Sequence, residues 1–161
     1  MSQRATQARR DGDLLSQALK LVRRYRGLTA VEVAAAMHMP VRTYERFEAG
    51  EGRFNVDYVH RFAAATDSDP HAITMAVDVG SPDLAWRSAD NKLITVMTIG
   101  AQRFNADCGD LLHLLEARDG ISVVTAMFQQ LRQLAEARAE AARWLEDGAA
   151  DLSAMRPKPG R

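Results

Sequence analysis

The sequence has little cysteine and no long apolar run, and these absences exclude several classes of protein. The single cysteine, Cys108, cannot form an internal disulfide, which fits a reducing compartment. The longest apolar runs, such as residues 33–37, are far shorter than the roughly 20 residues that span a bilayer. The first residues, MSQRATQARRDGD, lack the apolar segment of a secretory signal. We therefore expect a cytoplasmic protein without a membrane partner.

The chain also lacks an excess of either charge. Its 21 basic residues equal its 21 acidic residues in number, which argues against a protein that coats nucleic acid by bulk charge. The charges are unevenly distributed, however. Residues 1–26 contain seven basic side chains and two acidic ones, a local excess of five. The N-terminal part is therefore basic.

Residues that support metal or covalent chemistry are few and scattered. Besides Cys108 they are the four histidines His38, His60, His71 and His113. None of the CxxC, HxxxH or HExxH spacings occurs, and no glycine-rich phosphate loop follows a strand pattern. A lone cysteine near a helix start is more typical of a small core residue than of a catalytic thiolate. We expect no enzymatic activity, no metal and no cofactor.

Helical periodicity dominates the first half of the chain. Apolar residues recur at spacings of three and four from Leu14 to Tyr25, and Gly27 ends the pattern. Thr29 and Glu32 form a capping-box pattern, which predicts a second helix that runs to about residue 37. Three further short helices are predicted: one over about 41–49, one that Asn55 caps, and one that Asp69-Pro70 caps and that ends near residue 77.

The second half of the chain predicts three more helices, over residues 91–104, 110–117 and 122–146. The segment ITVMTI could by itself be a buried strand, but the helical periodicity on both sides favours a helix. The last helix should be the longest, because few breakers interrupt it and apolar residues recur at spacings of three, four and seven.

Turn signals at Gly80, Ser81 and Pro82 suggest where the two halves are divided. The predicted fold is all-α, a five-helix domain followed by a small helical domain with a long C-terminal helix. The expected parts are a mobile N-terminal arm (1–11), a first domain (12–78), a linker (79–88), a second helical domain (89–147) and a disordered tail (148–161).

The predicted third helix has an outward face that a small helical core does not explain. Its members are Val41, Arg42, Thr43, Glu45 and Arg46. An α-helix fits the roughly 12 Å wide major groove of DNA, where arginine can bond to guanine and threonine or valine can touch a thymine methyl group. A solvated charged surface is the alternative explanation for this face.

Residues 28–50, LTAVEVAAAMHMPVRTYERFEAG, resemble the helix-turn-helix of phage-repressor-like (Cro/CI, XRE) transcriptional regulators. The matching positions are Leu28, Thr29, Glu32, Val33, Ala34, Met39, Thr43, Tyr44, Glu48 and Gly50. The resemblance covers residues 14 to about 77. It implies a DNA-binding domain whose recognition helix spans about 41–49.

The resemblance also implies roles for particular residues. The expected contacts to DNA bases come from Val41, Arg42, Thr43 and Arg46. The expected contacts to the DNA backbone come from Thr29, Arg53 and Asn55. Arg23 and Glu48 lie where family members place a structural ion pair, and we do not expect them to contact DNA.

Three positions depart from the family pattern. Ala30 replaces a glutamine that contacts a phosphate, so that contact is lost. His38 replaces the turn glycine, and must adopt a left-handed conformation unless the turn differs. Pro40 replaces the serine or threonine cap of the third helix, and can start a helix but cannot cap it with a side chain.

One recognition helix gives only weak specificity, so we expect a homodimer on an inverted-repeat operator. The apolar faces of the C-terminal helices would form its interface, although the alternative is an intramolecular bundle in a monomer. These helices could also contact RNA polymerase or another regulator.

The layout of residues 89–117 resembles the C-terminal region of alphaproteobacterial regulators, some of which control phage-like gene-transfer clusters. The alternative function is a helical protein-protein adaptor, either antitoxin-like or a cofactor that binds RNA polymerase. Charge neutrality is compatible with that alternative.

Overall fold

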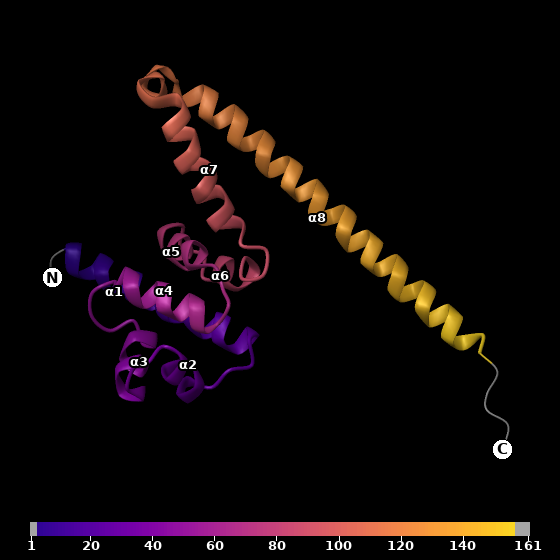
Figure 1. Ribbon diagram of the computed structural model, residues 1–161, viewed down its shortest axis with the longest axis horizontal. Helices are drawn as coiled ribbons and strands as arrows, with labels where there is room; N and C mark the ends of the chain where they lie inside the picture. Colours follow the sequence, from indigo (N-terminus) through magenta and orange to yellow (C-terminus); the bar gives the residue numbers. More distant parts are fainter. Residues whose placement is uncertain (1–2, 157–161) are drawn as a thin grey trace. The chain divides into compact units, whose positions relative to one another are not determined.

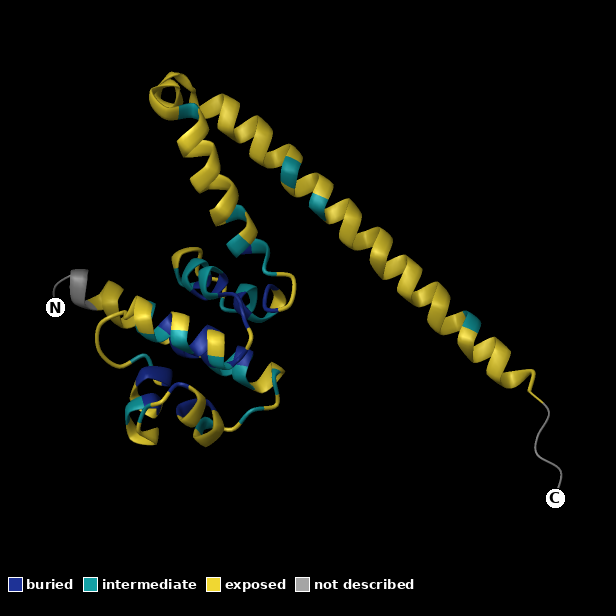
Figure 2. Ribbon diagram, viewed as in Figure 1, coloured by how far each residue is buried: buried dark blue, intermediate teal, exposed yellow. Residues whose placement is uncertain are grey.

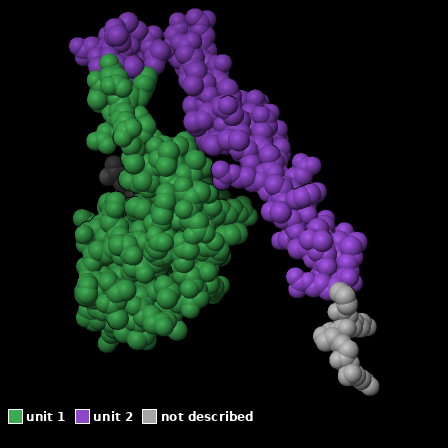
Figure 3. All heavy atoms as spheres, turned by 45° about the vertical axis from the view of Figure 1, so that its right-hand side comes forward, with its two compact units in different colours: residues 1–107 green, residues 108–161 purple. Residues whose placement is uncertain are grey.

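The computed structural model describes residues 3–156, and every regular element in this range is a helix, as predicted (Figure 1). In order they are α1 (Gln3–Tyr25), α2 (Ala30–Ala36), α3 (Val41–Glu48), α4 (Val56–Ala65), α5 (Pro70–Asp78), α6 (Asp83–Arg87), α7 (Leu93–Cys108), the 3-10 helix η1 (Gly109–Leu114) and α8 (Ala117–Ala154). Within these residues no helix is both long and apolar enough to cross a bilayer. The chain divides into two compact units, one up to Asp107 and one from Cys108 (Figure 3).

The first unit is built around α1, which packs against α3, α5 and α6. Buried residues line the inner faces of these short helices (Figure 2). The core contains Leu15, Ala18, Leu19, Val22, Val33, Ala34, Met37, Tyr44, Phe47, Val59, Phe62, Ala63, Ile73, Ala76 and Ala85. Burial of a large apolar side chain stabilises a fold by roughly 1.5–3 kcal/mol. This core therefore holds α2 and α3 in place on α1.

Three helix starts have the side-chain caps that the sequence predicts. Thr29 and Glu32 form the capping box of α2, and Asn55 accepts a hydrogen bond from the Tyr58 N–H at the start of α4. Asp69 caps α5, where Pro70 occupies the first turn. The local sequence therefore determines where α2, α4 and α5 begin.

α1 begins at Gln3, whereas the sequence predicted a mobile arm over residues 1–11; residues 1 and 2 lie outside the described part. The arm was predicted because residues 1–11 are polar and show no helical periodicity. Glycine is a poor residue for a helix interior, but Gly12 has a tertiary role. A Cβ atom on Gly12 would lie 2.6 Å from the Gly50 carbonyl oxygen, so the backbones of α1 and the α3 C-terminus meet here. Gly50 also has a φ of 72°.

Residues 79–88 are part of the first unit and not the predicted linker. α6 packs against α1 and α5, and Ala85 and Ala89 are fully buried. Trp86 contacts the ring of Tyr25 at 5.6 Å between centroids. The turn residues Gly80, Ser81 and Pro82 predicted a linker, but they precede the short helix α6, which packs against α1.

The second unit also differs from the predicted elements. The expected helix over 110–117 is the 3-10 helix η1, and the expected helix over 122–146 extends from Ala117 to Ala154 as α8. Residues 148–154 of the predicted disordered tail are therefore helical, and residues 157–161 of that tail lie outside the described residues. Alanine and leucine are strong helix formers and extend α8 past Gly148.

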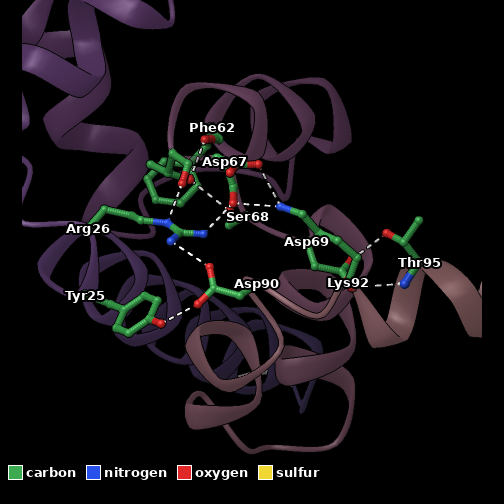
Figure 4. Close-up of polar contacts among 10 residues, drawn as sticks. Tyr25, Arg26, Phe62, Asp67, Ser68, Asp69, Asp90, Lys92 and Thr95 are labelled. Atoms are coloured by element: carbon green, nitrogen blue, oxygen red, sulfur yellow. Dashed lines mark hydrogen bonds and ion pairs between the residues drawn. The ribbon is translucent and has the colours of Figure 1, made fainter.

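One buried carboxylate, that of Asp69, caps two helices of the first unit, and Figure 4 shows its contacts with Thr95. Asp69 is fully buried, and its Oδ1 accepts from the N–H groups of His71 (3.0 Å) and Ala72 (3.1 Å) at the start of α5. Its Oδ2 accepts from the N–H groups of Ile94 and Thr95, both at 3.0 Å, at the start of α7. α7 is thereby attached to the first unit.

A second polar network ties the loops around this carboxylate to α1 (Figure 4). Arg26 donates to the carbonyl oxygens of Thr66 (2.8 Å) and Asp67 (2.6 Å), and its ion pair with Asp90 spans 2.7 Å. Lys92 donates to the Asp67 carbonyl oxygen at 2.7 Å and to its carboxylate at 3.0 Å. These contacts hold the loop before α5 against the loop before α7.

The pair implied by the resemblance, Arg23 and Glu48, joins α1 to α3. Arg23 Nε lies 2.6 Å and Nη2 3.1 Å from the two Glu48 oxygens, and the Tyr44 hydroxyl donates to the same carboxylate at 2.6 Å. Burial alone would raise the pKa of Glu48, but the hydrogen bonds from Arg23 and Tyr44 outweigh it and hold the pKa below its ordinary value. The charged form of Glu48 therefore stabilises the position of α3.

We predict that Glu48→Ala lowers the free energy of unfolding by about 3–5 kcal/mol, because Arg23 loses its partner in a largely buried site. Because folding lowers the pKa of Glu48, its contribution is complete above the ordinary value of 4.5 and is lost as pH falls through the folded value. Urea denaturation at pH 7 and at several values below 4.5 should show the difference from the native chain narrowing. Glu45→Ala, at an exposed position of α3, is the control. An equal loss for both variants would contradict the assignment.

We predict that Asp69→Ala destabilises the first unit by about 0.5–2 kcal/mol for each of the two caps it removes. Hydrogen exchange at the Ile94 and Thr95 amides should speed up more than exchange in α3, since the start of α7 loses its acceptor. Asp78→Ala, at an exposed aspartate of α5, is the control and should leave these amides unchanged. Unchanged protection at Ile94 in the Asp69→Ala variant would show that α7 is held by other contacts.

Candidate nucleic-acid interface

α2 and α3 are joined by a tight turn in which His38 has a left-handed conformation, with a φ of 52°. Arg61 of α4 donates to the carbonyl oxygens of Met37 and His38, the latter at 3.3 Å. Pro40 precedes α3 in an extended conformation and provides no side-chain cap. The non-glycine turn is therefore held from α4. Arg61 was not among the predicted site residues, because its only signal in the sequence is a basic residue on the predicted fourth helix.

The two faces of α3 differ sharply in exposure. Tyr44, Phe47 and Glu48 are buried against the core. On the opposite face Arg42 and Glu45 are exposed, Val41 is 37 % exposed, the Arg46 side chain is 70 % exposed and Thr43 is half-buried. The four residues predicted to contact bases therefore lie on one accessible face, and each side chain can reach beyond the backbone of α3.

The loop between α3 and α4 brings predicted backbone contacts close to this face. Thr43, Arg46, Arg53 and Asn55 line one hollow, together with Phe47, Glu51 and Tyr58. Arg53 and Asn55 are both exposed. Because Asn55 caps α4 through its Oδ1, its amide N–H groups point away from that bond and can donate elsewhere. The surface thus offers guanidinium and amide donors within a short span.

Glu51 brings a negative charge into the same surface. Its Oε2 lies 3.2 Å from Arg46 Nε, and both side chains are more than half exposed. An exposed pair of this kind is worth little, so the Arg46 side chain can exchange partners readily. Glu51 was not among the predicted site residues, because i,i+5 spacing across a helix end is not a usual ion-pair pattern.

Thr29 is less available than the sequence analysis assumed. Its N–H and its hydroxyl both donate to Glu32 Oε2 at 2.7 Å, and the hydroxyl accepts from the Glu32 N–H at 3.3 Å. The Thr29 N–H, followed by the hydroxyl, holds the pKa of Glu32 below its ordinary value. A phosphate at this helix start would therefore have to displace a carboxylate.

The basic residues of α1 are divided between structure and surface. Arg23 and Arg26 are engaged in ion pairs within the first unit, whereas Arg9, Arg10 and Arg24 are exposed. Within residues 3–156 no three His, Cys, Asp or Glu side chains are arranged to hold a metal ion. The concentration of exposed donors on α3 and the following loop is therefore the site that the structure favours.

Comparison with known proteins agrees with this placement. Residues 14–73 match the family of the helix-turn-helix domain, and this range begins within α1, contains α2, α3 and α4, and ends within α5. Neither a curated protein nor a solved structure matches the chain. The similarity to the helix-turn-helix domain family therefore covers 60 of the 161 residues of the chain.

Proposed function

We propose that this chain is a sequence-specific regulator of transcription that binds double-stranded DNA and resembles phage-repressor-like (XRE) regulators. The observation that carries the proposal is the accessible face of α3 within a helix-turn-helix domain. A helix of this width enters the major groove, where side chains can read base edges. The protein acts in the cytoplasm, is associated with the nucleoid when bound to DNA, and is not an enzyme.

The proposed roles follow from side-chain chemistry. Arg42 and Arg46 can each donate two hydrogen bonds to a guanine, and Val41 and Thr43 can contact thymine methyl groups. Arg53 and Asn55, next to them in the following loop, contact the DNA backbone. Thr29 contributes only where a phosphate replaces Glu32, so its part in binding is the smallest of the set.

We further propose that the protein binds as a homodimer to an inverted repeat. A single module of this kind contacts few phosphates, and non-specific binding reaches only about 10⁻⁴ to 10⁻⁶ M at physiological salt. Two recognition helices about 34 Å apart on one face of DNA would read two half-sites. RNA polymerase or another regulator is a further partner at the operator.

We predict that Arg42→Ala weakens binding to the preferred site by roughly 1–3 kcal/mol and relaxes base preference, since a base contact is lost. Arg53→Ala should weaken binding to all sequences alike and reduce the salt slope by about one. Selection of binding sites from a random DNA library, followed by titrations between about 50 and 200 mM salt, measures both effects. Arg103→Ala, at an exposed position of α7, is the control with the same loss of charge.

If neither Arg42→Ala nor Arg53→Ala changes DNA affinity, the helix-turn-helix domain serves another purpose. The protein would then be a helical adaptor, such as an antitoxin or a cofactor of RNA polymerase. This conclusion requires that both variants are folded, which is checked by comparing their thermal unfolding with that of the native chain.

We predict that Glu51→Gln raises DNA affinity by about two- to fivefold, because it releases Arg46 and removes a negative charge beside the phosphates. The gain should shrink as salt concentration rises. Fluorescence anisotropy with labelled DNA measures it. Asp107→Asn, at an exposed position of α7, makes the same change in net charge and should leave affinity unchanged. Weaker binding by the Glu51→Gln variant would mean that Glu51 positions Arg46 for binding.

A further inference from the structure

α8 is a 38-residue helix without a single buried residue (Figure 2), although its sequence carries an apolar stripe. Leu134, Leu145 and Leu152 are 56 %, 63 % and 69 % exposed. The stripe follows a seven-residue repeat. Its positions are 124, 131, 138, 145 and 152, alternating with 127, 134, 141, 148 and 155. Only Arg138 and Gly148 are not apolar among these ten positions. A repeat of seven is the pattern of two helices that wind around each other.

The stripe is large enough to form an interface between two chains. From residue 124 to residue 155 it is about 47 Å long at 1.5 Å per residue, and a helix is about 10 Å wide. Two such surfaces together cover on the order of 1,000 Å², which is the size that a specific interface requires. A contiguous apolar patch of this size on one chain indicates a partner.

Side-chain sizes are unequal along the stripe. The first half has large residues at and beside the repeat positions, including Phe128, Leu131 and Leu134. In the second half Ala141, Ala142, Gly148 and Ala149 are small, whereas Leu145 and Leu152 are large. The large residues of the first half pack best against these small ones when the second helix runs in the opposite direction.

We propose that α8 of one chain pairs with α8 of a second copy in antiparallel orientation, centred between residues 139 and 140. Residues about equally far from this midpoint face each other. The facing pairs are Leu131 with Gly148, Phe128 with Ala149, Leu134 with Leu145, Arg138 with Ala141 and Trp144 with Ala137. A parallel pair would instead place Arg138 against Arg138 and Gly148 against Gly148, which leaves like charges together and a cavity.

The charges of α8 favour the same orientation. Residues 117–138 contain three arginines and two acidic residues, a net charge of +1. Residues 139–154 contain one arginine and four acidic residues, a net charge of −3. An antiparallel pair places each positive half beside a negative half, whereas a parallel pair places the two negative halves together. The α8 pair is the interface of the homodimer in the proposed function, and this inference rests on that proposal.

Spin labels test the orientation. In a Cys108→Ser background, a single label at Ser153→Cys lies level with residue 126 of the partner in the antiparallel pair, so the two labels are about 40 Å apart along the axis. A parallel pair would bring them to about 10 Å, the distance between packed helices. Electron-electron distance measurements on a protein with the mass of two chains should give the longer value. A monomer by light scattering, or the short distance, would overturn the proposal.

A double-mutant cycle tests the register. Leu131→Ala should weaken the dimer at least about tenfold by leaving a cavity. Gly148→Leu should weaken it about five- to hundredfold, because a Cβ has open space in one chain but not beside Leu131 of a partner. The double variant should return to within about threefold of the native dissociation constant, since one change fills the space left by the other. Effects that multiply would overturn the register, and circular dichroism verifies that each α8 remains helical.

These tests separate this proposal from the proposed function. An antiparallel dimer that binds no DNA would overturn the function alone. A monomer that binds a single half-site with base preference would overturn the α8 interface alone.

Discussion

The buried carboxylate of Glu48 is the constraint on which the recognition surface depends. It lies on the inner face of α3 and binds Arg23 of α1 and the Tyr44 hydroxyl. An ionic group buried in this way is costly without its partners, so α3 can adopt only orientations that keep all three groups in contact. The outer face of α3 is thereby presented to solvent in one fixed direction. Specific reading of bases requires such rigidity, because a loosely held helix would average over several alignments.

The same domain uses neighbouring arginines for two different purposes, and burial decides which. Arg23, Arg26 and Arg61 donate to carboxylates or carbonyl oxygens of the domain itself. Arg42 on α3 and Arg53 in the loop that follows α3 are both exposed to solvent. Arg46 is intermediate, because its exposed partner Glu51 competes with any external anion. The net neutrality of the chain therefore does not describe the local charge at the surface that is proposed to contact DNA.

Sequence patterns predict the elements whose signals are local. The capping box at Thr29 and Glu32, the cap at Asn55 and the break at Pro40 all act within four residues, and each is where the structure has it. Interactions between distant segments leave no such signal. Gly12 looks like a helix breaker until Gly50 is seen beside it, and Ala85 looks like part of a linker until α1 covers it.

The candidate surface shows the same division between local and distant signals. The outward set on α3 follows from its spacing, since Tyr44, Phe47 and Glu48 must face the core. Glu51 and Arg61 depend on how a loop and another helix return to that surface, and no short-range pattern contains this information. The capping-box pattern predicts that Thr29 and Glu32 form hydrogen bonds with each other. It does not show that the Thr29 N–H and hydroxyl both donate to Glu32 and so leave little capacity for a phosphate, which only the structure reveals.

The two units solve one physical problem together. A helix-turn-helix domain with few phosphate contacts gains little affinity from a second copy unless the copies are joined, because joining makes the second binding event intramolecular. α8 has 38 residues, and none of them is buried. Its apolar residues therefore do not form a core within the second unit. Its exposed stripe is unfavourable in a single chain and favourable in a pair. In the proposed dimer, the free energy released when this stripe is covered would hold the two α3 helices on the same DNA.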